Sequence, residues 1–213
     1  DSYLDFQGSI SLTPSLRTLA LIEGPDPVLG AEIAALAAPG TPHAIENGNE
    51  LELPPHELTP AQYADAQAAM ALAERVAGFT GDIIMGGVYA LTDETKQAIR
   101  LALPRCGSWA RRGHVLDFQP CLVGVHLYTI SRDDIDWLNG LDADIAITET
   151  GSPTNCRPEK LAQQAAYQQQ LYAAAQQIRR LKYFIVYQGP SGAGCSDLET
   201  FGIRGKPAEE FFR

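Results

Sequence analysis

The sequence lacks any excess of positive charge. Its 213 residues include 16 Lys and Arg against 26 Asp and Glu, a formal net charge of −10. Nucleic acids and anionic membranes attract clustered positive charge, so we expect neither as a partner. No apolar run approaches the roughly 18 residues of a membrane-spanning helix. Residues 1–6 lack a basic segment followed by an apolar one, so we expect no signal peptide within this chain; one could have been removed before Asp1.

Cysteine is scarce, and the common metal and phosphate motifs are missing. The four cysteines form no C-x-x-C pair, and no histidine lies at zinc-ligand spacing from any of them. The sequence also has no glycine-rich phosphate-binding loop. We therefore expect no metal and no organic cofactor.

The chain instead has the composition of one folded domain, residues 1–213, with 45% apolar residues. Short apolar runs alternate with helical stretches, which is typical of βαβ units and a parallel sheet. Helices are expected after the N-caps Asp26, Thr59, Thr92 and Ser131, and from Pro158 to Arg180. The expected strands are 16–22, 43–47, 82–88, 122–127, 144–148 and 183–187, with a further candidate at 4–12.

Two parallel architectures fit this pattern, an open doubly wound sheet and a closed (β/α) barrel. Polar side chains follow five successive strands, at Glu50, Tyr89, His126, Glu149 and Gln188. In a barrel all such strand ends meet at one mouth, whereas an open sheet collects them only at its switch point. We therefore predict an α/β fold with a compact or incomplete TIM-type barrel. It should have fewer than eight regular βα units, with the shortfall before residue 43.

Two glutamates stand out because each ends an expected strand. Glu50 closes the segment Ile-Glu-Asn-Gly-Asn-Glu, and Glu149 lies in Ile-Ala-Ile-Thr-Glu-Thr-Gly. Glycoside hydrolysis uses two carboxyl groups, one to protonate the leaving oxygen and one to attack or to activate water. Two such glutamates can face each other across the mouth of a barrel. Glu46 and Glu23 are alternative candidates for the acid.

These segments resemble the retaining (β/α)8-barrel glycoside hydrolases of clan A. In that superfamily an Asn-Glu pair ends the fourth strand and a second Glu ends the seventh, as Asn49-Glu50 and Thr148-Glu149 do here. The segment Val-His-Leu-Tyr at 125–128 is similar to the family's sixth strand. Residues 201–207 resemble its closing segment. The resemblance covers roughly residues 43–207.

The resemblance implies a role for each matching residue. Glu50 would be the general acid/base and Glu149 the nucleophile. Asn49, His126, Tyr128 and Gln188 would bind the substrate, with Tyr128 also a hydrogen-bond donor to Glu149. The arginine that many members carry on the second strand has only a positional candidate here, Arg17.

The order of the strands also suggests two disulfides. Cys156 and Cys195 follow neighbouring strands at the mouth, while Cys106 ends a helix and Cys121 begins the next strand. Either pair would stabilise the fold by roughly 3–4 kcal/mol. Disulfides are typical of secreted proteins, so we expect an extracellular protein. The alternative is that all four cysteines are buried thiols.

The sequence thus predicts a monomeric, secreted glycosidase that acts on a β-linked carbohydrate with retention of configuration. The alternative is a non-catalytic carbohydrate-binding or interaction protein on a degenerate barrel. Loss of turnover in Glu149→Gln would distinguish the two, since a binding protein has no turnover to lose.

Overall fold

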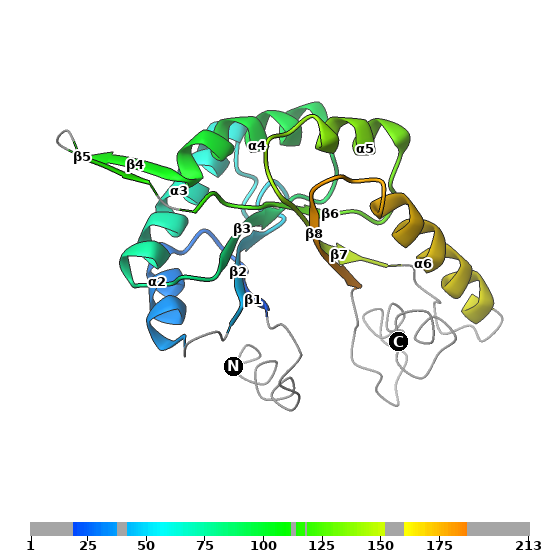
Figure 1. Ribbon diagram of the computed structural model, residues 1–213, viewed down its shortest axis with the longest axis horizontal. Coiled ribbons are helices and arrows are strands. Elements are labelled where there is room, and N and C mark those ends of the chain that lie inside the picture. Colours follow the sequence, from blue (N-terminus) through cyan, green and yellow to red (C-terminus); the bar gives the residue numbers. More distant parts are fainter. Residues whose placement is uncertain (1–18, 38–41, 112–113, 118, 152–159, 187–213) are drawn as a thin grey trace.

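The computed structural model describes residues 19–37, 42–111, 114–117, 119–151 and 160–186 (Figure 1). In this part the strands are β1 (Leu19–Ile22), β2 (Ala44–Asn49), β3 (Asp82–Gly87), β4 (Ser108–Arg111), β5 (His114–Asp117), β6 (Val123–His126), β7 (Ile145–Thr150) and β8 (Leu181–Val186). The helices are α2 (Pro27–Leu36), α3 (Pro60–Val76), α4 (Asp93–Cys106), α5 (Arg132–Asn139) and α6 (Leu161–Ala175). None of these helices is long and apolar enough to cross a membrane.

Four helices begin where the sequence predicts, because a side chain caps each one. Asp26, Thr59, Thr92 and Ser131 each accept a backbone N–H two or three residues further on. Thr59 and Ser131 also form complete capping boxes. These bonds satisfy N–H groups that a helix leaves without partners in its first turn. The predicted start of the last helix, Pro158, lies outside the described residues.

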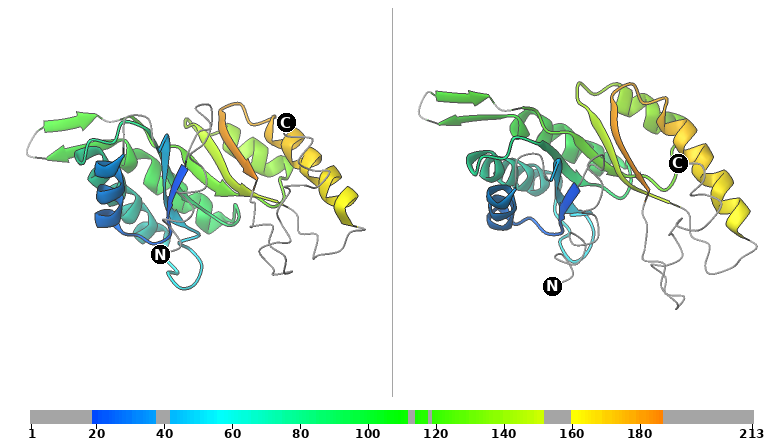
Figure 2. Two further views of the ribbon diagram at one scale, coloured as in Figure 1. Left: turned by 90° about the horizontal axis from the view of Figure 1, so that it is seen from below. Right: turned by 60° about the horizontal axis from the view of Figure 1, so that its bottom comes forward.

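Six strands run parallel and follow one another in chain order. β1, β2 and β3 form one sheet, and β6, β7 and β8 form the other. Two parallel bridges, Ile84 to Leu122 and Val88 to Val125, join β3 to the β6 segment. The helices form an arc outside the strands (Figures 1 and 2). This is the arrangement of a TIM-type barrel, as the sequence predicts.

The inner side of this arc has a core of its own. Its buried members, Ala44, Ile84, Leu122 and Ala146, pack with Leu19 and Tyr183, so that all six parallel segments contribute. Across the interior, the Tyr183 hydroxyl on β8 donates to Asp82 Oδ2 on β3 at 2.6 Å, although β6 and β7 lie between these strands. The sheet is therefore curved strongly enough for a side chain on β8 to reach β3.

Within the described residues the barrel remains incomplete. β1 pairs only with β2, and β8 pairs only with β7. The six strands form an open arc, and the prediction of fewer than eight regular βα units is confirmed for this part of the chain. The candidate strand at 4–12 lies outside it.

An antiparallel hairpin interrupts the alternation and was not predicted. β4 and β5 pair from Ser108 opposite Asp117 to Arg111 opposite His114. The hairpin projects away from the barrel after α4 (Figure 1). Helix α4 contains Pro104 near its end and continues to Cys106, the residue at which the sequence predicts that the helix ends.

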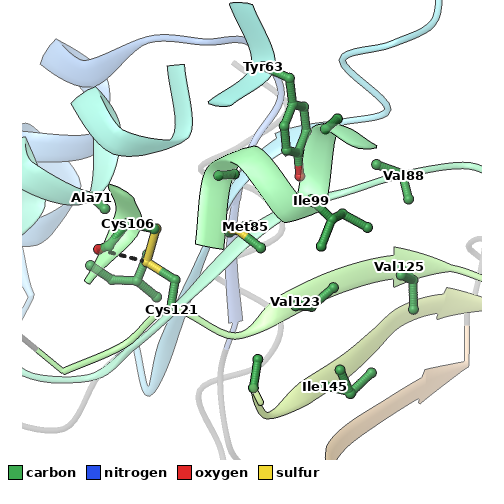
Figure 3. Close-up of a cluster of buried hydrophobic side chains, with 14 of the residues drawn as sticks. Tyr63, Ala71, Met85, Val88, Ile99, Cys106, Cys121, Val123, Val125 and Ile145 are labelled. Carbon is green, nitrogen blue, oxygen red and sulfur yellow. Dashed lines mark hydrogen bonds between the residues drawn. A yellow bond between two sulfur atoms is a disulfide. The ribbon is translucent and has the colours of Figure 1, made fainter. Parts of the chain in front are cut away.

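A disulfide closes the base of this hairpin. Cys106 is the last residue of α4, Cys121 lies two residues before β6, and their sulfur atoms are bonded (Figure 3). Both residues are buried in the main hydrophobic core between strands and helices. This pairing agrees with the sequence prediction. Cys156 and Cys195 lie outside the described residues.

Removal of this disulfide should lower stability. The bridge closes a loop with a sequence separation of 15, and a loop of about this length is worth about 3 kcal/mol. We expect Cys106→Ser/Cys121→Ser to unfold at a midpoint roughly 6–12 °C lower than the parent protein. Thermal unfolding followed by circular dichroism measures this difference. Equal midpoints would show that the bridge does not stabilise the barrel.

Helix α3 fixes the ends of β2 and β3 through buried polar contacts. Gln67 donates to Asn47 O at 2.6 Å and accepts from Gly86 N at 3.1 Å. The Tyr63 hydroxyl, seen beside the core in Figure 3, donates to Gly86 O at 2.6 Å. Asn47 also donates to Glu74, where burial raises the carboxyl pKa to about 8. These bonds hold the two strands at the point where the site begins.

Candidate active site

The carboxyl ends of β2, β6 and β7 bring three ionisable side chains together. Glu50 follows β2 directly, His126 is the last residue of β6, and Glu149 lies near the end of β7. One carboxylate oxygen of Glu50, one of Glu149 and a ring nitrogen of His126 all lie within 4.8 Å of one another. The two glutamates therefore lie close together, as the sequence predicts.

His126 lies at the centre of the cluster and is almost completely buried, with 1% of its surface exposed. Its Nδ1 lies 2.9 Å from Glu50 Oε1 and 3.7 Å from Glu149 Oε2, and its Nε2 lies 3.4 Å from Glu46 Oε1. Burial alone lowers the pKa of His126, but hydrogen bonds to Glu46 and Glu50 and the charges of Glu46 and Glu149 raise it to about 10. The surrounding carboxylates therefore favour the protonated form of His126, in which both ring nitrogens donate.

Glu46 lies below His126, inside the barrel. It points inward because side chains alternate along β2, and Ala44 already faces the inner core. Its Oε1 accepts from Thr148 Oγ1 at 2.6 Å and from Gly87 N at 3.0 Å. Only 2% of Glu46 is exposed. The sequence left Glu46 open as an alternative acid; the structure places it as the buried partner of His126.

Gly87 explains how these groups fit together at the end of β3. A Cβ at this position would lie 2.2 Å from His126 Nε2 and 2.8 Å from Glu46 Oε1. Any larger residue would therefore displace the histidine or the glutamate. Gly87 also accepts a backbone hydrogen bond from Glu50 N at 2.9 Å.

Glu149 is held by a tyrosine from the neighbouring strand. The Tyr128 hydroxyl donates to Glu149 Oε1, which is the contact expected from the sequence. The Tyr167 hydroxyl on α6 in turn donates to the backbone carbonyl of Tyr128. Burial raises the pKa of Glu149, whereas the Tyr128 hydrogen bond and the charge of His126 act in the opposite direction and favour the carboxylate.

Glu50 occupies an unusual backbone conformation at the turn after β2. Its φ is 49°, in the left-handed region that non-glycine residues rarely adopt. Gly48, with a φ of 107°, lies against Leu51, and a Cβ there would come within 2.5 Å of that side chain. Strained positions of this kind cluster at functional sites, where the surrounding structure holds them in place.

Of the other predicted substrate-binding residues, Asn49 lies in the described part of the chain and Gln188 lies outside it. Asn49 is half-buried, its backbone N–H donates to Glu23 O at 3.1 Å, and its side-chain oxygen has no hydrogen-bond partner among the described residues. Glu23, the other alternative acid, is exposed at the end of β1. Gln188, Arg17 and the closing segment 201–207 lie outside the described part of the chain.

Sequence reasoning missed the contributions of Thr148, Gly87 and Tyr167. Thr148 could have been found by alternation, because it lies two residues after Ala146 and so faces inward as Glu46 does. The adjacent glycines at the end of β3 were a signal for close packing. No sequence pattern distinguishes Tyr167 from the other polar residues of α6.

Glu50, His126 and Glu149 also have the spacing of metal ligands. Among the described residues, this is the group of histidine and carboxylate side chains that lies close enough together to hold a metal ion. A histidine must be neutral to coordinate a metal. The surrounding carboxylates raise the pKa of His126 to about 10 and so favour its protonated form. A metal ion bound here would therefore have to displace a proton from His126.

The described residues have the fold of a TIM-type barrel, and the cluster lies at the carboxyl ends of its strands. No known protein family matches the sequence. No curated protein matches it either.

Similar solved structures share this fold. A GH113 β-1,4-mannanase is 14% identical, with a TM-score of 0.56, and the match covers 86% of this chain and 58% of the mannanase chain. A GH128 subgroup V exo-β-1,3-glucanase from Cryptococcus neoformans is 16% identical, with a TM-score of 0.52, and the match covers 90% of this chain and 74% of that one. The chain thus spans little more than half the length of the mannanase. At these identities the likeness concerns the fold.

Proposed function

We propose that this protein is a retaining glycoside hydrolase that cleaves a β-linked poly- or oligosaccharide. The observation that carries the proposal is the separation of Glu50 and Glu149, which have carboxylate oxygens within 4.8 Å of each other. Retaining enzymes hold their two carboxyl groups roughly 5–5.5 Å apart, whereas inverting enzymes need roughly 6.5–9.5 Å to admit a water molecule. The geometry therefore favours direct attack by one glutamate.

Glu50 is assigned as the acid/base and Glu149 as the nucleophile. Glu149 attacks the anomeric carbon as Glu50 protonates the departing glycosidic oxygen, and a covalent glycosyl-enzyme forms. Glu50 then takes a proton from water, whose oxygen attacks the same carbon and releases the sugar and the Glu149 carboxylate. Two displacements restore the original configuration.

The partners of each glutamate support this assignment. Glu149 accepts a hydrogen bond from Tyr128 and lies near the His126 cation, and both interactions stabilise the carboxylate needed for attack. Nδ1 of His126 lies 2.9 Å from Oε1 of Glu50, so Oε2 is the oxygen that we assign to face the glycosidic oxygen. The unpartnered side-chain oxygen of Asn49 is available to accept a hydroxyl of the sugar.

The similar structures support the β linkage of the proposed substrate. The mannanase and the glucanase are both described as acting on β-linked glycans, of mannose and glucose respectively. The fold that this protein shares with them, together with the placement of its own Glu50 and Glu149, supports a β-linked substrate. The Cys106–Cys121 disulfide supports secretion, where such a polymer would be met.

The test is hydrolysis by the purified protein of β-1,4-mannan, β-1,3-glucan, β-1,4-xylan and aryl β-glycosides. We expect turnover on at least one of these substrates. ¹H NMR during the first minutes should show the β-anomer of the product before mutarotation. Initial release of the α-anomer would contradict retention, and no turnover on any substrate would contradict the proposal in favour of a non-catalytic barrel.

A further inference from the structure

A cavity of about 360 Å³ lies beside the glutamate pair, at the carboxyl ends of β3 and β6. Tyr128 lines this cavity and also donates its hydroxyl to Glu149. One side chain thus separates the cavity from the proposed nucleophile. A ligand in the cavity would contact the side chain that holds Glu149, so the space adjoins the reaction centre.

Tyr89 forms an aromatic wall of the cavity. Tyr89 is 49% exposed. The other large apolar side chains that are exposed in the described part of the chain are aliphatic. Its ring lies 5.9 Å from that of Tyr128 at an angle of 44°, so the two rings are not stacked face to face. Its backbone N–H donates to Glu52 Oε1 at 2.6 Å, which ties it to the loop after β2. This bond holds the backbone that carries the exposed ring, and the ring itself contacts Tyr128.

The remaining walls combine apolar and hydrogen-bonding groups. Leu91 contributes an apolar surface, while Thr92 and Thr129 contribute hydroxyl groups. Asp134 also lines the cavity, and its capping bonds to Ser131 use only Oδ2. A sugar ring has an apolar C–H face and a rim of hydroxyl groups, which matches an aromatic wall surrounded by hydroxyl and carboxylate oxygens.

We propose that this cavity binds the sugar unit next to the one at the glutamate pair, with Tyr89 as the platform on which that unit packs. The inference rests on the proposed function and extends it to an oligosaccharide substrate. The volume is at the lower end of the roughly 300–1,000 Å³ of small-molecule sites, which suits one further sugar unit. Binding of this remote unit would add to the energy available for cleavage.

The experiment measures binding in Glu149→Gln, which prevents turnover during the measurement. Isothermal titration calorimetry is performed with β-1,4-mannotriose, β-1,3-glucotriose, mannose and glucose. When Tyr89→Ala is added to the Glu149→Gln variant, trisaccharide affinity should fall by about tenfold relative to Glu149→Gln alone. Monosaccharide affinity should be unchanged. Tyr89→Trp should restore trisaccharide affinity. Leu36→Ala is the matched control, because Leu36 is an exposed apolar side chain on α2, and it should have no effect.

The outcomes separate the two proposals. Trisaccharide binding that is equal with and without Tyr89→Ala would overturn the cavity as a sugar site and leave the proposed function standing. Failure of Glu149→Gln to bind either trisaccharide, together with no turnover of any tested β-glycan by the parent protein, would overturn both. Thermal unfolding of each variant shows that the comparison is made between folded proteins.

Discussion

Replacement of Glu149 by glutamine is expected to abolish hydrolysis of β-linked glycans while leaving the protein folded. The amide cannot attack the anomeric carbon, so kcat should fall on the order of 10⁴-fold or more. Stability should change by no more than about 1 kcal/mol, because burial raises the pKa of this carboxyl and a neutral side chain avoids that desolvation cost. Steady-state kinetics and thermal unfolding measure the two effects.

Glu94→Gln is the control for this experiment. Glu94 is an exposed glutamate in the first turn of α4, so the same chemical change there should leave the rate unaltered. Comparable activity in Glu149→Gln and Glu94→Gln would exclude Glu149 as the nucleophile. A parent protein without turnover would instead support the non-catalytic alternative.

Replacement of Glu50 by glutamine should affect substrates according to their leaving groups. Hydrolysis of an unactivated glycan should slow by roughly 10²–10⁴-fold, because the departing oxygen receives no proton. Dinitrophenolate leaves without protonation, so a dinitrophenyl β-glycoside should still form the glycosyl-enzyme. We expect a burst of one dinitrophenolate per enzyme molecule followed by a slow steady state. Azide, which needs no base, should accelerate that slow phase.

The same assay distinguishes the three glutamates that the sequence offered as acids. Glu46→Gln should show no burst with azide rescue, because Glu46 is enclosed by Thr148, Gly87 and His126. Glu23→Gln should behave as the parent protein does, since Glu23 is exposed beyond β1. A burst and azide rescue in either of these variants, but not in Glu50→Gln, would reassign the acid.

Local signals made much of the barrel predictable. Cap residues such as Asp26 and Thr59 satisfy helix N–H groups through their own side chains, and this chemistry is visible in a single sequence. Alternation of strands and helices predicted the parallel order in the same way. The β4–β5 hairpin was missed because its pairing is antiparallel and interrupts that alternation.

The site was predictable in its strand-end glutamates but not in the packing around them. Glu50 and Glu149 were found because each lies at the end of an expected strand. The role of Glu46 depends on which side chains cross the barrel interior, and the contact with Thr148 exists only when β2 and β7 curve toward each other. The conformation of Glu50, with φ of 49°, likewise arises from tertiary packing rather than local preference.

The hydrogen bond between Thr148 and Glu46 has a consequence for folding. It joins residues 102 positions apart in the chain, on strands with two others between them. Contacts of such separation carry a high cost in loop-closure entropy and form after the local βα units. The buried histidine can therefore gain its full set of carboxylate partners only in the last stages of folding. Intermediates that have their helices and neighbouring strand pairs in place will still lack the assembled glutamate pair.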